Sequence, residues 1–369
     1  MQAQKKTSAD YADVRRLKKN LCKSAKSVDA SSEYRGRVAP SPTGFLHIGH
    51  AMTFWHAQQR AHEAGGKLVL RIEDVERDRC RKEFADAISE DLRWFGLDWD
   101  EGPDIGGPFV PYIQSERRRY YLEALEKLRV DGFVYPCKCS RKDVIQASLA
   151  PHDENEEAIY PGTCRPRGSV IEAAAHHAEA VGRRMRAATG RDLQATRLPP
   201  QILLGATAEV VAAAVSAAEL EELPPGTAAV TTPTEVPGGT HWRFRVPDGE
   251  QVEFLDGRLG KQSAVAGRDF GDFIVWRRDD IPAYQLAVVV DDAAMQVSEV
   301  VRGEDLLMST FRQLLLYRAL GLRPPKFYHA PLVLDKSGKR LAKRHGALSL
   351  RALRERRSTP EELRSLNPL

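Results

Sequence analysis

The sequence predicts an α/β fold built on a parallel sheet, because a strand, a helix and a second strand follow one another near its start. Residues 37–39 form a short strand pattern, and residues 47–64 form a helical pattern that ends at a Gly-Gly pair. Residues 67–72 are a second β-rich run. The two strands of such a unit lie parallel in one sheet, and ligands bind at the carboxyl ends of these strands.

The rest of the chain predicts further alternation of helices and strands. Amphipathic helices are expected near residues 82–95 and 116–129, and a β-rich pattern resumes at residues 241–246. The remaining expected elements are an apolar strand at 287–290 with a short helix after it, a strand at 297–302, a helix at 310–319 and a strand at 328–334.

Composition sets bounds without identifying a function. The chain has 369 residues, 42% of them hydrophobic, so it can bury a sizeable core. Its formal charge of +4 arises from 55 basic and 51 acidic residues, and this balance alone does not identify a nucleic-acid binder. Five cysteines without a secretory signal favour a reducing compartment. We therefore expect a soluble, cytoplasmic protein that is monomeric and binds no membrane.

Shifts in composition divide the chain into five expected segments. Residues 1–34 are polar and basic, which favours a mobile arm over a targeting peptide because acidic residues interrupt it. Residues 168–240 are rich in alanine and then in proline, as expected of a surface insertion. The other three are two halves of a catalytic domain, at 35–134 and 241–369, and a cysteine-bearing segment at 135–167.

The first chemical motif is His47-Ile48-Gly49-His50, which lies where the first strand leads into the first helix. Two imidazoles three residues apart share one face of a helical turn. The free N–H groups at the start of a helix bind anions, and Gly49 leaves room for a flat ring. Chance occurrence of this short string is the alternative.

The second motif is the basic loop at residues 339–346, Lys-Arg-Leu-Ala-Lys-Arg-His-Gly, which follows an apolar strand. A loop of cations can clamp a triphosphate, because phosphoryl chemistry needs positive charge where the phosphate oxygens gain negative charge. The alternative is a solvated basic loop without a ligand.

Together these motifs resemble a known family. Residues 37–44, Arg-Val-Ala-Pro-Ser-Pro-Thr-Gly, followed by the His-Ile-Gly-His string, look like the opening of glutamyl-tRNA synthetases. The basic loop is similar to the second signature of class I synthetases, with Arg340 and Ala342 as departures and Lys343 retained. The resemblance covers about residues 37–165 and 241–350. It implies a class I aminoacyl-tRNA synthetase Rossmann-type (HUP-like) parallel sheet with an inserted zinc-bearing subdomain.

The resemblance also assigns roles to individual residues. It implies that His47, His50 and Lys343 are catalytic, and that Mg²⁺ accompanies ATP. Its implied ATP-binding residues are His47, Gly49, His50, Arg340 and Lys343. Its implied glutamate-binding residues are Arg37, Val38, Ala39, Pro40, Ser41, Glu73, Tyr284 and Arg302. Cations would bind the two carboxylates of glutamate and Glu73 its ammonium group. An ordinary salt-bridge network among strand ends is the alternative.

A third constellation predicts a structural zinc site. Cys137, Cys139 and Cys164 supply three thiols, and tetrahedral zinc needs a fourth ligand. His152 is the generic choice, whereas the resembling family places a tyrosine there, which is Tyr160 in this chain. Three reduced thiols without a metal are the alternative.

Chain length favours one branch of the family. Only 25 residues follow Arg344, which leaves no room for the helical anticodon-binding domains of ordinary glutamyl-tRNA synthetases. The chain thus resembles the truncated glutamyl-queuosine tRNA(Asp) synthetases, which attach glutamate to queuosine in the anticodon. The expected partners are ATP, L-glutamate and a tRNA, namely queuosine-bearing tRNA(Asp). A variant that charges the 3′ end of a tRNA and an inactive tRNA-binding paralogue are the alternatives.

Overall fold

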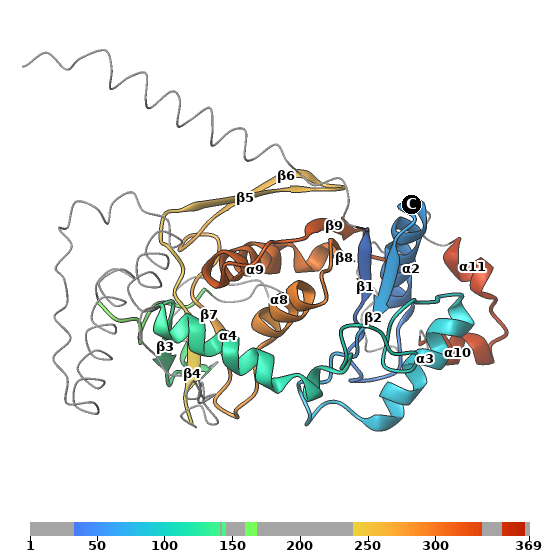
Figure 1. Cartoon of the computed structure of the whole chain (residues 1–369), viewed down its shortest axis with the longest axis horizontal. Coiled ribbons are helices and arrows are strands. Elements are labelled where there is room, and N and C mark those ends of the chain that lie inside the picture. The colour runs from blue at the N-terminus through green and yellow to red at the C-terminus, as the bar shows by residue number, and fades with distance from the viewer. Residues whose placement is uncertain (1–32, 141, 145–158, 168–238, 334–348, 366–369) are drawn as a thin grey trace, which may run out of the picture.

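The computed structural model describes residues 33–140, 142–144, 159–167, 239–333 and 349–365 (Figure 1). The N-terminal arm, almost all of the Ala- and Pro-rich insertion, and the basic loop with Arg340 and Lys343 lie outside the described residues. None of the helices in the described part is long and apolar enough to cross a bilayer.

The predicted strand–helix–strand unit is confirmed. Strand β1 (Arg35–Val38) pairs in parallel with β2 (Lys67–Leu70), and α2 (Ile48–Glu63) connects them. The helix ends in a turn through Gly65 at φ 61°, a left-handed conformation that glycine adopts without strain. The chain then enters β2 with the Lys67 N–H donating to the Tyr34 carbonyl at 2.8 Å.

A second parallel pair belongs to a separate four-stranded sheet, in the order β6–β5–β9–β8, and lies beside the first pair. Strand β8 (Glu299–Gly303) pairs in parallel with β9 (Lys326–Ala330), and α9 (Leu307–Leu320) connects them. Strand β8 also lies beside β1, because the N–H of Ser298 donates to the Arg35 carbonyl at 2.9 Å. The carboxyl ends of β1, β2 and β8 consequently point toward one region (Figure 1).

The expected strand at Ala287–Val290 is wrong. These residues lie in the middle of helix α8 (Tyr284–Ala294). A short run of β-branched residues fits a buried strand or a buried helix equally well by its pattern. Here the segment from Leu286 to Asp292 is buried throughout, so the helix is apolar on most of its circumference and shows no clear amphipathic period.

The remaining elements include groups that lie at opposite ends of the molecule. Figure 1 places α3 with the C-terminal helices at one end and the small sheet β3–β4–β7 at the other. The expected helix at 82–95 is confirmed as α3. The bounds are α3 (Lys82–Phe95), α4 (Arg118–Val130), β3 (Val134–Cys137), β4 (His241–Phe244), β5 (Gln251–Asp256), β6 (Gly260–Val265), β7 (Phe273–Trp276), α10 (Leu350–Glu355) and α11 (Pro360–Arg364).

Two apolar clusters hold the fold together. One packs α4, α8 and α9 with the strands from β4 to β7, and the other packs α2 and α3 against β1, β2 and α10. Burial of apolar area stabilises both, at roughly 25 cal/mol for each Å² removed from water. A third, smaller cluster contains Tyr135, Cys137 and Tyr160, with Cys139 and Cys164 packed against it.

Candidate active site

Four of the predicted glutamate-binding residues lie at the ends of the core elements. Arg37 is the next-to-last residue of β1, and Arg302 is the next-to-last residue of β8. Glu73 follows the end of β2. Tyr284 is the first residue of α8 and is 39% exposed. The sheet thus brings together side chains that are more than 200 positions apart, at the edge where parallel sheets bind ligands.

Arg71 organises the charges in this region. Its guanidinium is fully buried and donates from Nη1 to Asp292 Oδ1 at 2.7 Å and from Nη2 to Glu73 Oε1 at 2.9 Å. Asp292 comes from α8, so this arginine ties the end of β2 to that helix. Burial raises the pKa of Glu73, and the neighbouring Arg71 opposes this rise.

Asp291 forms a second buried centre beside Arg71. Its carboxylate accepts hydrogen bonds from Arg117 Nε at 2.6 Å, Gln114 Nε2 at 2.7 Å and the Tyr121 hydroxyl at 2.8 Å. Because hydrogen bonds to charged groups are stronger than neutral ones, this cluster fixes α8 against α4 and holds the wall of the site.

Arg302 differs from Arg71 and Arg37 in how its charge is satisfied, because no carboxylate of the described residues lies within ion-pair distance of it, whereas Arg71 and Arg37 each have an aspartate. Arg37 donates from Nη1 to the Val301 carbonyl at 2.8 Å, and its buried Nε, which has no hydrogen-bond partner among the described residues, lies 3.6 Å from Asp292 Oδ1 in an ion pair. Arg302 Nη1 is also buried without such a partner. Each residue is only 4% exposed. Buried N–H groups are normally paired, so Arg302 marks a site that an anion would complete.

The electrostatics agree with this geometry. Burial lowers the pKa of Arg302, and the positive charge of Arg37 adds to the effect, whereas Tyr284 opposes it. A carboxylate bound at Arg302 would oppose both effects and stabilise its charge. The arrangement therefore favours a ligand that carries negative charge.

The proline-rich turn closes one side of this region. The Val38 carbonyl accepts the Arg71 N–H at 2.9 Å, and the Pro40 carbonyl accepts the Glu73 N–H at 3.0 Å. These two hydrogen bonds continue the β1–β2 pairing beyond the strands and hold the proline-rich turn beside Glu73. Ala39 is half-buried and Ser41 is exposed at the surface of the turn.

The His-Ile-Gly-His string lies at the start of α2, as expected. His47 is the N-cap residue, and its Nδ1 accepts the Gly49 N–H at 3.4 Å. His50 follows in the first turn and is half-buried. The position of Gly49 allows close approach, because a Cβ there would meet only His47 Nδ1, at 3.8 Å. The predicted partners of this motif, Arg340 and Lys343, lie outside the described residues.

The three cysteines and Tyr160 come together as predicted. The Sγ atoms of Cys139 and Cys164 are 3.5 Å apart, and the Tyr160 hydroxyl lies 3.4 Å from Cys137 Sγ and 3.6 Å from Cys139 Sγ. The three sulfur atoms all lie within 4.8 Å of one another. Ligands of tetrahedral zinc with bonds of about 2.3 Å are ~3.8 Å apart, so this donor set fits a metal ion. His152 lies outside the described residues.

The surroundings of the cluster favour thiolate at Cys164, whereas burial raises the pKa of Cys139. A backbone N–H group from Lys138 lowers the pKa of Cys164 to about 7. Arg243 donates from Nε to Cys137 Sγ at 3.2 Å and lies over the Tyr160 ring at 3.9 Å. Since only deprotonated cysteine binds metals, Arg243 supports metal binding although it is no ligand.

Several residues that shape the site were not predicted. Asp291, Asp292 and Arg243 carry no local motif, and their partners are distant in the sequence. The Asp-Asp pair after an apolar run is the one signal that could have been used, because acidic residues next to buried segments need cationic partners.

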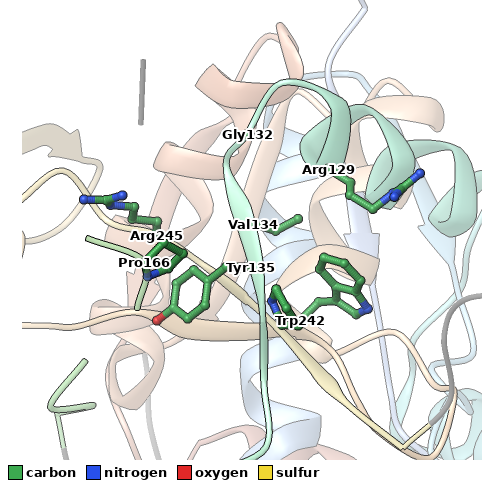
Figure 2. Close-up of a pocket in the computed structure, with 8 residues that line it drawn as sticks. Arg129, Gly132, Val134, Tyr135, Pro166, Trp242 and Arg245 are labelled. Carbon is green, nitrogen blue, oxygen red and sulfur yellow. The ribbon is translucent and has the colours of Figure 1, made fainter. Parts of the chain in front are cut away.

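A separate pocket of about 270 Å³ lies against β3 and β4 (Figure 2). Figure 2 shows Arg129 and Arg245 on opposite sides of β3, with Trp242 and Tyr135 beside the strand. None of the predicted glutamate- or ATP-binding residues lines this pocket. It is therefore distinct from the charged cluster at the strand ends.

Comparison with known proteins places this geometry in context. The profile of the family described as "tRNA synthetases class I (E and Q), catalytic domain" matches residues 33–184 and 229–366. The Glutamyl-Q tRNA(Asp) synthetase of Nitratidesulfovibrio vulgaris is 44% identical, over 87% of this chain and 81% of that protein. The protein of the same name from Symbiobacterium thermophilum is 43% identical, over 88% and 83%.

Ligases for tRNA(Glu) and their structures match less of their own length. Glutamate–tRNA ligase 2 of Syntrophus aciditrophicus is 38% identical over 90% of this chain, which spans only 56% of that protein. The crystal structure of the glutamate–tRNA synthetase from Elizabethkingia anophelis superposes with a TM-score of 0.57 at 28% identity, covering 85% of this chain and 53% of that one. The chain thus spans about half the length of these two proteins.

Proposed function

The chain belongs to the class I tRNA synthetases for glutamate and glutamine, and from this premise we propose that it activates glutamate with ATP and transfers it to queuosine in tRNA(Asp). The family match confirms the resemblance carried by the two motifs, and it makes the chain a ligase of this family. It also confirms the expected fold class of the catalytic domain.

The observation that best supports glutamate as the amino acid is the incompletely satisfied Arg302, with Arg37 as a second buried arginine of the cluster. Arg302 has one buried N–H group without a hydrogen-bond partner among the described residues, and Arg37 Nε has an ion pair with Asp292 at 3.6 Å but no hydrogen bond. Glutamate at neutral pH carries two carboxylates, which would accept from these groups in charge-assisted hydrogen bonds. Glu73, with Tyr284 beside it, would receive the ammonium group.

In the first proposed step, the α-carboxylate of glutamate attacks the α-phosphate of ATP. Glutamyl-adenylate forms and pyrophosphate leaves. His47 and His50 hold the nucleotide at the start of α2, where the N–H groups and the helix dipole favour phosphate. Gly49 lets the adenine approach the backbone. Mg²⁺ would arrive with ATP and neutralise its phosphates, and Lys343 and Arg340 would stabilise the transferring charge.

In the second proposed step, a hydroxyl of the queuosine cyclopentene ring attacks the mixed anhydride, and AMP leaves. The support for this acceptor is the similarity to two proteins named Glutamyl-Q tRNA(Asp) synthetase, each matched over more than four fifths of its length. Single-stranded anticodon bases are the part of an RNA that proteins usually recognise one base at a time.

We further propose that zinc binds Cys137, Cys139, Tyr160 and Cys164. The ligand distances above and the Cys164 N–H, which donates to the Tyr160 hydroxyl at 2.8 Å, support this donor set. Zinc here would supply a structural cross-link only. It would join the end of β3 to the segment at 159–167.

A first experiment tests glutamate activation. Exchange of labelled pyrophosphate into ATP should depend on glutamate and should proceed without tRNA. Arg302→Met should raise the KM for glutamate by about a hundredfold, since leaving a buried charge partner unpaired costs about 3 kcal/mol. Exchange that depends on another amino acid, with none for glutamate, would refute the assignment.

A second experiment identifies the acceptor. Enzyme, ATP and labelled glutamate are incubated with tRNA(Asp) that carries queuosine, with the same tRNA lacking queuosine, and with tRNA(Glu). Label should enter only the first, and it should still enter when that tRNA lacks its 3′-terminal adenosine. Efficient labelling of tRNA(Glu), with no effect of queuosine, would instead assign the chain to 3′-end charging.

A further inference from the structure

A row of buried polar groups lies directly behind Arg302. It begins at Asp256 at the end of β5, continues through His329 on β9 and Thr310 on α9, and ends at the Arg302 guanidinium on β8. Asp256 is 2% exposed, and His329 and Thr310 are 0% exposed. Four different elements therefore contribute to one continuous chain of hydrogen bonds, which we call the Asp256 relay.

Asp256, the first residue of the relay, determines which group donates and which accepts in each of its hydrogen bonds. Asp256 accepts backbone N–H groups from Arg258 and Leu259, both at 2.9 Å, and lies 2.6 Å from His329 Nδ1. These donors hold the pKa of Asp256 below its ordinary value although burial opposes them. As a carboxylate it can only accept, so His329 Nδ1 carries a hydrogen and donates it.

The tautomer of His329 sets the rest of the relay. Burial lowers the pKa of His329, and the charge of Arg302 adds to this, so the ring is neutral and its Nε2 is an acceptor. The Thr310 hydroxyl, 2.9 Å from Nε2, must then donate to it. The Thr310 oxygen is left to accept from Arg302 Nη2 at 2.6 Å.

This relay holds Arg302 without neutralising it. Nη2 donates to Thr310, Nε lies 3.4 Å from His329 Nε2, and Nη1 has no hydrogen-bond partner in the part of the chain that the structure describes. Among the described residues, no carboxylate lies within ion-pair distance of Arg302, whereas Arg71 has three. A neutral acceptor fixes the orientation of the guanidinium and leaves its charge available for a ligand.

We propose that Asp256, His329 and Thr310 are positioning residues that orient Arg302 toward a carboxylate of the bound amino acid. This proposal rests on the proposed activation of glutamate. An arginine side chain loses conformational entropy when it is held in one rotamer. A ligand binds more strongly to an arginine that is already held in the binding rotamer, because binding then causes no further loss of entropy. The relay does this through Thr310, which touches Arg302 and need not touch substrate.

Thr310→Val tests the relay, because valine keeps the shape of threonine and removes the hydroxyl. In glutamate-dependent pyrophosphate exchange, the KM for glutamate should rise about tenfold, as expected for loss of a hydrogen bond to a charged group. The kcat and the KM for ATP should stay within about twofold, since Thr310 affects only the binding of glutamate. Thr310→Ser restores the hydroxyl and should restore the KM.

A matched control is available one residue earlier. Ser309 is also buried on α9, and its hydroxyl accepts from Gln285 at 3.1 Å, outside the relay. Ser309→Ala should leave the KM for glutamate unchanged. If Thr310→Val does not fold by circular dichroism, Thr310→Cys has a similar size and offers only a weak acceptor, and the same rise in KM is expected.

The outcomes separate the two proposals. If the unmodified enzyme shows no glutamate-dependent exchange, the proposed function fails. If it shows exchange and Thr310→Val or Thr310→Cys leaves the KM for glutamate unchanged, or lowers only the kcat, the relay does not position Arg302. A rise of the same size in Ser309→Ala would mean that general packing of α9 is responsible, and this would also refute the relay.

Discussion

Replacing Asp291 with alanine should destabilise the protein strongly, because three side chains depend on its carboxylate. Arg117, Gln114 and Tyr121 all donate to it at 2.8 Å or less. Asp291 is 0% exposed and Arg117 is 2% exposed. The substitution would leave a guanidinium in the core without its carboxylate and two further donors without an acceptor.

The size of the effect follows from this burial. Removing one partner of a buried ion pair typically costs about 3–5 kcal/mol, because the remaining charge is left uncompensated. Asp291→Asn keeps the shape and one acceptor oxygen, so its loss should be smaller. The control is Asp86→Ala on α3, where the Lys82 ion pair at 2.8 Å is exposed on both sides and is worth less than about 1 kcal/mol.

Urea unfolding followed by circular dichroism measures the free energy of unfolding of each variant. We expect the order Asp291→Ala, Asp291→Asn, Asp86→Ala from the most to the least destabilised. A loss for Asp291→Ala of less than about 1 kcal/mol, no greater than at an exposed pair, would refute the inference that this cluster fixes α8.

Three further predictions concern single groups. His56 is buried with neither ring nitrogen hydrogen-bonded among the described residues, so His56→Leu should raise the free energy of unfolding by about 1–3 kcal/mol at pH 7. Burial lowers its pKa from 6.5, so the native state binds fewer protons than the unfolded state; the gain should grow as pH falls below 6.5, and a gain that shrinks would contradict this. Protein purified without chelator should contain about one zinc ion per chain, and Cys164→Ser should lower the zinc content and the Tm; metal-free folded protein would count against the site. A Cβ at Gly66 would lie 2.3 Å from the Tyr34 carbonyl, whereas one at Gly44 meets nothing within 4 Å; Gly66→Ala should therefore cost about 1–3 kcal/mol and Gly44→Ala much less, and equal losses in thermal unfolding would refute the comparison.

Local patterns predicted the first half of the sheet well. The helix at 82–95 has a strong apolar period and its bounds agree with α3, and the strands around α2 are marked by the Gly-Gly turn. The pattern of apolar residues predicted the wrong element at Ala287–Val290. This part of α8 is buried on most sides, so its apolar residues do not recur with the helical period that would distinguish it from a strand.

The site was predictable only where a motif marks it. Arg37, the cysteines and Tyr160 belong to recognisable strings, and the structure brings the predicted metal ligands together. Thr310 and His329 belong to none, because their function depends on contacts between strands and a helix that are distant in sequence. Which distant polar groups become partners is set by the packing of the sheet, and a single sequence does not record it.

The contact between β1 and β8 also determines when the site can form during synthesis. Arg37 Nη1 and the Val301 carbonyl that it contacts are 264 positions apart. Chains leave the ribosome from the N-terminus at about 5–20 residues per second, so β1 waits for about ten seconds or more before β8 has been synthesised. Until then, the edge of β1 that β8 will cover has unpaired backbone groups, which other chains can bind. Chaperone binding to nascent chains of this protein should therefore decline only after residue 330 has emerged.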